Sequence, residues 1–244
     1  MKLLKLQLEN FRSHKSFKTE FEDENIILIL GENGKGKTNI LEGIFMLVAG
    51  KAFRDADNDD LIYWGMDFFT IKGVTDKGIS LEVSYANYPR KQKIFKKNEV
   101  KISHNEYIGN FVCVLFHPKD LNMLYLEPSL RRKYMNLTLS QTDKFYLEAL
   151  GEYTKILKHR NALLDTISEG EKSQNELAVW DEKLASSGSV IITAFTVSLA
   201  IRDSFFNSSS ALFFSVISKE DPITRIGLPL LSLIIYPLAS TCAY

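Results

Sequence analysis

The sequence predicts an α/β fold in which a buried strand leads through a glycine-rich loop into a helix. Three observations carry this prediction. A short apolar run at Asn25–Leu30 precedes three glycines within Gly31–Gly36, and apolar residues recur at helical spacing from Lys37 onward. A second stretch, residues 68–103, is rich in strand-forming residues. After Pro128 the apolar spacing becomes helical again, so we expect a helical region beyond the sheet.

The elements before the loop are predicted to be two strands joined by a turn. Leu3–Leu8 and Lys15–Phe21 alternate apolar and polar residues, and Asn10–His14 lies between them. The run at Asn25–Leu30 is apolar throughout its centre, which is typical of a strand buried on both faces. The helix that follows the loop carries an apolar stripe and ends at Gly50.

Residues 68–103 are predicted to form an antiparallel meander beside this core. Gly78 and Pro89 mark its turns. Its β-rich segments are Phe68–Val74, Ile79–Tyr85 and Gln92–Phe95. A further buried strand is expected at Phe111–Phe116, and His117 is interpreted as a residue at the end of that strand rather than a ligand.

The helical region is predicted to form an antiparallel hairpin. Apolar residues recur at helical spacing over Tyr146–Leu164 and again over Leu177–Leu184. Ser168–Gly170 separates the two stripes, and a break this short favours two helices that pack against each other.

Composition bounds the class of protein. The 244-residue chain is 45% hydrophobic and 25% charged, which are ordinary globular values. Thirty basic and 30 acidic residues give a formal net charge of +0, which excludes a supercharged tail protein. The balance also argues against nucleic-acid binding by overall charge, but it does not exclude a local basic face. Two cysteines, Cys113 and Cys242, imply no disulfide framework and favour a reducing cytoplasm. Met1–Lys5 has no apolar run before its charges, so we expect no signal peptide.

The segment Gly31–Thr38 matches the phosphate-binding pattern G-x-x-x-x-G-K-[ST] without a gap. Glycine lets backbone N–H groups approach phosphate oxygens, and the following helix directs its positive N-terminal dipole toward the same oxygens. Lys37 is expected to reach the β- and γ-phosphates, and the Thr38 hydroxyl to hold Mg²⁺. The alternative is a glycine-rich turn that only caps a helix. The predicted nucleotide-binding residues are Gly31, Glu32, Asn33, Gly34, Lys35, Gly36, Lys37 and Thr38.

Further segments follow the loop in an order that points to one family. Thr38–Ile44 reads T-N-I-L-E-G-I, and Val179–Ala185 reads V-W-D-E-K-L-A. Other matching segments are Leu8–His14, Lys51–Arg54, Val114–Leu121, Pro128–Tyr134, Tyr146–Leu150 and Leu157–Leu164. Together they resemble the SMC-like ATPases of DNA repair and, most closely, the RecF family, over about residues 1–194.

The resemblance implies an ABC-type ATPase head with a short helical arm. Members of this family bind ATP and Mg²⁺, form ATP-dependent homodimers, and are weak DNA-dependent ATPases. They bind duplex DNA and gapped junctions, cooperate with RecO and RecR, help to load RecA at gaps and support the SOS response. By the same resemblance, Gly31–Thr38 would bind ATP, and Arg12 would contact the nucleotide from the turn before it.

A complete head of this type also needs an apolar strand that ends in acidic residues and a serine-glycine signature. The acidic pairs Asp59–Asp60, Asp181–Glu182 and Glu220–Asp221 do not end an apolar strand. Ser186–Ser189 resembles the signature only superficially, because it falls in the helical arm. We therefore expect no catalytic residues in this chain, weak nucleotide binding and negligible hydrolysis.

Charge density divides the chain near residue 194. The first 194 residues hold 54 charged side chains, whereas the last 50 hold six. The resemblance ends at the same place, so we expect a truncation or frameshift there and a missing C-terminal half of the head. The predicted domains are the N-terminal part of the head at 1–125, a helical arm at 126–194 and an apolar, serine-rich tail at 195–244. Two prolines interrupt the apolar stretch Ile226–Cys242, and we expect no membrane anchor there.

A dense basic stretch lies within the predicted meander, at Arg90, Lys91, Lys93, Lys96, Lys97 and Lys101. Basic side chains release counterions from DNA phosphates, so the stretch is a candidate DNA contact. The alternative is a solvated hairpin face. Two other functions stay open at this point: a P-loop kinase or transferase that acts on a small molecule, and a non-enzymatic DNA-binding fragment.

Overall fold

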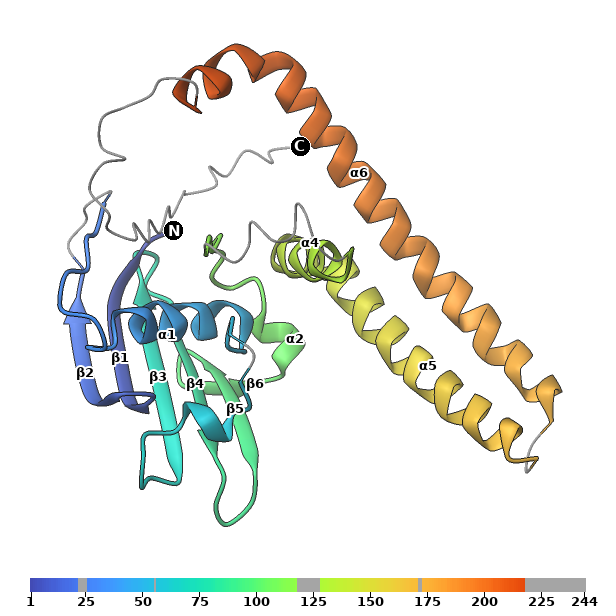
Figure 1. Cartoon of the computed structure of the whole chain (residues 1–244), viewed down its shortest axis with the longest axis horizontal. Coiled ribbons are helices and arrows are strands. Elements are labelled where there is room, and N and C mark those ends of the chain that lie inside the picture. Colours follow the sequence, from blue (N-terminus) through green and yellow to red (C-terminus); the bar gives the residue numbers. More distant parts are fainter. Residues whose placement is uncertain (22–25, 55, 118–127, 171–172, 218–244) are drawn as a thin grey trace. The chain divides into compact units, whose positions relative to one another are not determined.

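The computed structural model describes residues 1–21, 26–54, 56–117, 128–170 and 173–217 (Figure 1). They form an α/β fold that divides into two compact units. The head unit is the described part of Met1–Leu121 together with Ser140–Thr142. The arm unit is the described part of Asn122–Leu139 and Asp143–Leu231.

The head unit is built on a six-stranded sheet in which every neighbouring pair of strands is antiparallel. The strand order is β2-β1-β3-β4-β5-β6. The strands are β1 (Leu3–Phe11), β2 (His14–Glu20), β3 (Phe68–Thr75), β4 (Ser80–Ala86), β5 (Gln92–Lys97) and β6 (Val100–Ile102). The two predicted N-terminal strands and the antiparallel meander are therefore confirmed.

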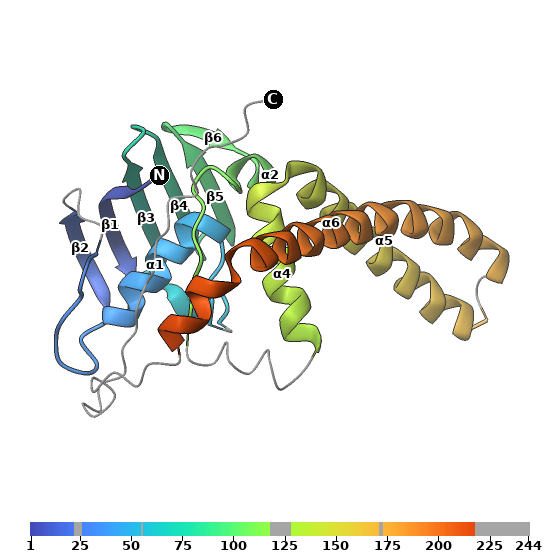
Figure 2. The same cartoon turned by 90° about the horizontal axis from the view of Figure 1, so that it is seen from above.

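Helix α1 (Lys37–Ala49) covers one face of this sheet, as Figure 2 shows from above. All its residues from Ile40 onward are buried. Its Gly43 lies against Leu8 of β1, where a Cβ atom would come within 2.6 Å of the leucine side chain. The helix ends as predicted at Gly50, which has a left-handed φ of 63°. The described part of the head unit also contains two short helical turns, η1 (Asp59–Leu61) and α2 (His104–Tyr107).

Two predicted strands are wrong. The described residues Ile26–Leu30 form no strand, and their side chains are mostly exposed, with exposed fractions of 87% for Ile26 and 79% for Leu30. Phe111–Phe116 is also irregular, with Phe111 and Cys113 buried but Val114 and Phe116 exposed. A doubly buried strand needs partners on both edges and layers on both faces, and no described strand pairs with either segment.

The arm unit confirms the predicted helical hairpin. It contains α4 (Pro128–Thr142) as far as Leu139, together with α5 (Lys144–Ser168), η3 (Gln174–Glu176) and α6 (Leu177–Ile217). Helix α5 lies beside α6 (Figures 1 and 2). The Asp143 side chain caps α5 by accepting a hydrogen bond from the Tyr146 amide at 3.1 Å. Between the helices, the His159 and Trp180 rings stack with centroids 5.3 Å apart.

Helix α6 continues through residue 194 without a break. The domain boundaries 1–125, 126–194 and 195–244 stay predictions. The pair Glu220–Asp221 and the apolar stretch Ile226–Cys242 lie outside the described residues. None of the described helices combines the length and apolar character that a membrane span requires.

Candidate nucleotide-binding site

The segment Gly31–Thr38, which matches the phosphate-binding pattern and is called the phosphate loop below, leads into α1, whose first residue is Lys37. Gly34 and Gly36 have φ values of 82° and 85°, a left-handed backbone that glycine adopts without strain. The Lys37 ammonium donates hydrogen bonds to the backbone carbonyls of Gly31 and, at 2.8 Å, of Glu32. The loop therefore closes around a cation, and its own residues from Gly31 to Lys35 are exposed.

The start of α1 is well suited to an anion. Gly36 is the N-cap residue and offers no side-chain acceptor, and the first turn carries no acidic residue. The positive end of the helix dipole is thus not neutralised by a carboxylate in the first turn of α1. Thr38, the predicted Mg²⁺ ligand, is half-buried in the same turn. Backbone amides, an ammonium and a hydroxyl are the donors that a nucleotide phosphate with Mg²⁺ requires.

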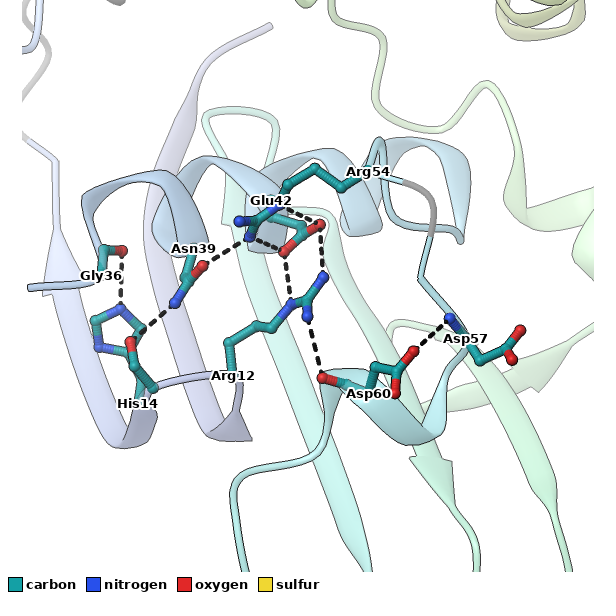
Figure 3. Close-up of polar contacts among 9 residues, drawn as sticks. Arg12, His14, Gly36, Asn39, Glu42, Arg54, Asp57 and Asp60 are labelled. Carbon is teal, nitrogen blue, oxygen red and sulfur yellow. Dashed lines mark hydrogen bonds and ion pairs between the residues drawn. The ribbon is translucent and has the colours of Figure 1, made fainter. Parts of the chain in front are cut away.

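A network of polar side chains fixes the opening turn (Asn10–His14) against α1 (Figure 3). At its centre is Glu42, which is fully buried on α1. Its carboxylate accepts hydrogen bonds from Arg12 Nε at 2.9 Å and Arg12 Nη2 at 3.3 Å. It also accepts from Arg54 Nε at 3.1 Å and from Arg54 Nη2. Desolvation raises the pKa of Glu42, but hydrogen bonds from Arg54 and Arg12 outweigh it, so the net pKa lies below its ordinary value.

The same network reaches the phosphate loop. Asn39 accepts a hydrogen bond from Arg54 Nη2 at 2.7 Å and donates one to Ser13 Oγ at 2.9 Å. The His14 Nε2 atom lies 3.1 Å from the Gly36 carbonyl oxygen. A Cβ atom at Gly36 would lie 2.5 Å from Ser13 Oγ and 2.6 Å from His14 Nε2. The opening turn thus packs directly against the last glycine of the loop.

Arg12 was expected to contact the nucleotide. In the structure its three guanidinium nitrogens contact protein oxygens: Nε and Nη2 bind Glu42, and Nη1 donates to the Asp60 carbonyl at 3.1 Å. Direct contact with the nucleotide stays a prediction. Glu42, Asn39 and Arg54 were not identified as site residues from the sequence. The available signal was a glutamate within the apolar stripe of α1, because a buried carboxylate requires cationic partners.

The predicted basic stretch does not form one surface. Lys91 pairs with Asp59, and Lys93 Nζ donates to Asn58 Oδ1 at 2.6 Å. Burial lowers the pKa of Lys93 to about 8. Strand alternation places Lys93 and Lys97 on the same sheet face as buried Phe95, whereas Lys96 is on the opposite face. Arg90 and Lys101 are exposed.

The strand register instead places a row of polar residues across the sheet face opposite α1. Leu8 of β1 lies against Gly43 of α1, and Gly73 of β3 lies against Leu47 of α1, so both positions are on the face that α1 covers. The residues next to them along each strand are therefore on the opposite face. The row comprises Lys18, Gln7, Lys72, Glu82, Lys96 and Lys101 on β2, β1, β3, β4, β5 and β6. We call its four lysines the lysine row. Lys72 and Lys96 each lie 2.9 Å from the buried Glu82 carboxylate, and Lys18 and Lys101 are exposed.

The remaining candidates take structural positions. Asp59 accepts hydrogen bonds from Tyr85 at 2.7 Å and from Lys91. Ser187 lies within α6 and donates to the Lys183 carbonyl at 3.0 Å, so this serine-rich segment is part of the arm helix. His117 lies beside Phe53, with ring centroids 5.8 Å apart. Within the described residues, no three His, Cys, Asp or Glu side chains group as metal ligands would.

Comparison with known proteins identifies the family. A family model described as "AAA domain" matches residues 5–187. "DNA replication and repair protein RecF" of Leptospira interrogans (serogroup Icterohaemorrhagiae serovar Lai) is 37% identical over 196 residues, 79% of this chain and 53% of the relative. The protein of the same name from Bacillus cytotoxicus is 34% identical over 195 residues, which are 79% of this chain and 51% of the relative.

A solved structure agrees with these relatives. It is described as "Structure of the recombination mediator protein RecF-ATP in RecFOR pathway", and it matches with a TM-score of 0.77 and 33% identity. The match covers 86% of this chain and 58% of the other. The chain spans about half the length of the curated relatives it matches. The chain therefore belongs to the AAA domain family and, within the matched residues, is a homologue of RecF.

Proposed function

We propose that this chain binds ATP at Gly31–Thr38 and is the nucleotide-binding part of a RecF-type ATPase in DNA replication and repair. The observation that carries the proposal is the loop itself: left-handed glycines, a central lysine ammonium and an uncapped helix N terminus lie together. A related protein, 33% identical, is described with ATP. A small-molecule kinase or transferase is not favoured, because the relatives of the chain are named for DNA replication and repair.

The chemistry of binding follows from the loop geometry. Backbone N–H groups of the loop and the first turn of α1 would receive the phosphate oxygens. Lys37 would exchange its hydrogen bonds with the Gly31 and Glu32 carbonyls for bonds to phosphate oxygens. The Thr38 hydroxyl would be a ligand of Mg²⁺, which neutralises phosphate charge when bound.

We further propose that this chain hydrolyses ATP negligibly. Hydrolysis requires a carboxylate that holds Mg²⁺ or orients the attacking water. Glu42 is a poor candidate, because two arginines hold its carboxylate in a buried position and lower its pKa. Asp59 is similarly engaged, since Lys91 and Tyr85 hydrogen-bond to its side chain and lower its pKa.

The cellular role is proposed by homology. The relatives are named for DNA replication and repair, and the matched structure is described within the RecFOR pathway. We propose that the chain binds duplex and gapped DNA in the cytoplasm, with RecO and RecR as partners and with an ATP-dependent homodimer as the assembled form. Help in loading RecA at gaps and support of the SOS response belong to the same proposal. For DNA contact, the lysine row is better placed than the linear stretch Arg90–Lys101.

The test is isothermal titration of the chain with ATP and Mg²⁺, combined with a steady-state ATPase assay. We expect saturable binding that is lost in Lys37→Ala, because the Lys37 ammonium is hydrogen-bonded to the loop carbonyls of Gly31 and Glu32 and is therefore positioned for the phosphates. Lys77→Ala is the matched control, since it removes an exposed lysine in the β3–β4 turn. Equal ATP affinity in wild type and Lys37→Ala would refute the site, and turnover that Lys37→Ala abolishes would refute the hydrolysis proposal.

A further inference from the structure

The opening turn and α1 are joined at three consecutive positions. Arg12 binds Glu42, Ser13 accepts from Asn39, and His14 lies at hydrogen-bond distance from the Gly36 carbonyl. The three partners are spaced three residues apart, which places them along one side of the helix and its N cap. Figure 3 shows the turn running along this side of α1. Any shift of the turn along the helix would therefore break all three contacts together.

The turn has a backbone that depends on these contacts. Asn10 and Arg12 have φ values of 50° and 53°, which are uncommon for residues other than glycine. A conformation of this kind is strained and persists only where the surrounding structure fixes it. Backbone hydrogen bonds from Arg12 N to Leu61 O and from Tyr63 N to Asn10 O, both 2.7 Å, supply part of that fixation. The Arg12 guanidinium adds to it through Glu42 and the Asp60 carbonyl.

Glu42 is the residue that joins the network. It is the acceptor for Arg12 from the opening turn and for Arg54 from the segment after α1. Arg54 in turn donates to Asn39, which donates to Ser13. A buried carboxylate between two guanidinium groups is stable only while both partners stay in place. The position of Ser13 beside Gly36 thus depends on Glu42 by two routes, one through Arg12 and one through Arg54 and Asn39.

We propose that Glu42 is a positioning residue for the phosphate loop. By holding Arg12 and Arg54, it fixes Ser13 and His14 against Gly36 and preorganises the loop amides before the nucleotide arrives. This inference rests on the proposed ATP site and deepens it. Glu42 acts through the opening turn and does not itself touch the nucleotide.

The experiment measures backbone amide exchange across the chain without nucleotide, followed by ATP titration. In Glu42→Gln the side chain keeps its size but loses the charge that holds two arginines. Where the loop joins α1, the Asn39 and Ile40 amides donate to the Gly36 carbonyl at 2.9 and 3.1 Å. We expect exchange of these two amides to accelerate about tenfold, with β3 and β4 unchanged, and the Kd for ATP to rise about tenfold. His14→Ala, which removes only the contact to Gly36, is expected to accelerate exchange of the same two amides and serves if Glu42→Gln does not fold.

Glu82→Gln is the matched control, because Glu82 is also buried between two cations but lies on the sheet face away from α1. It is expected to lower the unfolding midpoint without changing loop exchange or ATP affinity. A purely structural role for Glu42 would give the same pattern as Glu82→Gln, and that result would overturn the proposal. If the wild-type chain binds no ATP but Glu42→Gln still releases the loop amides, the proposed function fails and the positioning role stands.

Discussion

Two apolar regions of the head unit differ in burial. On the face of the sheet that α1 covers, Leu8, Ile71 and Val83 are completely buried. In Ile26–Leu30, an equally apolar segment immediately before the phosphate loop, most side chains are exposed. The difference lies in the neighbours: the first region has strands on both edges and a helix above it, and the second has no described strand beside it. Apolar composition therefore indicates a tendency to be buried, while strand formation needs a partner.

The largest expected effect is in the buried region. Phe69 is completely buried, with its ring 5.4 Å from that of Phe11 and 5.8 Å from that of Tyr85. Phe69→Ala should lower the free energy of unfolding by about 3–5 kcal/mol, because it leaves a cavity between two aromatic rings. Urea denaturation followed by tryptophan fluorescence measures it, and a loss below about 1 kcal/mol would contradict the proposed packing.

A somewhat smaller effect is expected where charge, rather than apolar surface, is buried under α1. Arg54→Met removes one of the two partners of Glu42 and keeps the length of the side chain. Breaking a buried ion pair in this way typically costs about 3–5 kcal/mol, and we expect the lower end because Arg12 still holds the carboxylate. The same denaturation series gives the value. If Arg54→Met were as stable as wild type, Glu42 would not need its second arginine.

The stability that the buried network of Glu42 contributes should depend on pH. The pKa of Glu42 is lowered in the folded state, so its carboxylate stabilises the fold above its ordinary value of 4.5, and that stability is lost as the pH falls further. We expect the free energy of unfolding to decrease below about pH 5, with a shallower decrease in Glu42→Gln. Denaturation at several pH values measures the slopes, and equal slopes would mean that Glu42 has the same pKa in both states.

Substitutions of exposed lysines on the sheet face opposite α1 should change DNA affinity rather than the free energy of unfolding. Lys101→Ala removes an exposed member of the lysine row, so DNA affinity should fall a few-fold and the salt slope should decrease by about one. Lys93→Ala is the comparison, since Lys93 is partly buried beside Asn58. Fluorescence anisotropy with duplex DNA at several salt concentrations tests both, and a larger effect of Lys93→Ala would argue against the lysine row.

The smallest effect is expected in the exposed segment. Leu28 is 69% exposed, so Leu28→Ser should change the free energy of unfolding by less than about 0.5 kcal/mol. Phe69→Ala and Leu28→Ser should therefore differ most in their effect on the free energy of unfolding. A loss of 2 kcal/mol or more, on the order of a core substitution, would mean that the segment is buried in solution.

Local patterns predicted the elements whose partners lie close in sequence. Alternation identified β1 and β2, turn residues separated β3, β4 and β5, and the motif located the loop at Gly31–Thr38. The predictions that failed concern features that depend on residues far apart in the sequence. The apolar run at Ile26–Leu30 was predicted to be a strand, because its pattern carries no information on whether partner strands exist. In the network of Arg12, Glu42 and Arg54 the hydrogen bonds join residues that are 30 and 12 positions apart, and no spacing rule connects them.

We propose that the phosphate loop binds ATP although the segment before it is exposed. Amide exchange during a titration with ATP and Mg²⁺ tests it most directly, because it reports on Ile26–Leu30 and Gly31–Thr38 separately. We predict saturable protection of the loop amides and none in β3 or β4, with the protection lost in Lys37→Ala. Unprotected loop amides at saturating ATP, or equal protection in Lys37→Ala, would show that Gly31–Thr38 is not the ATP site.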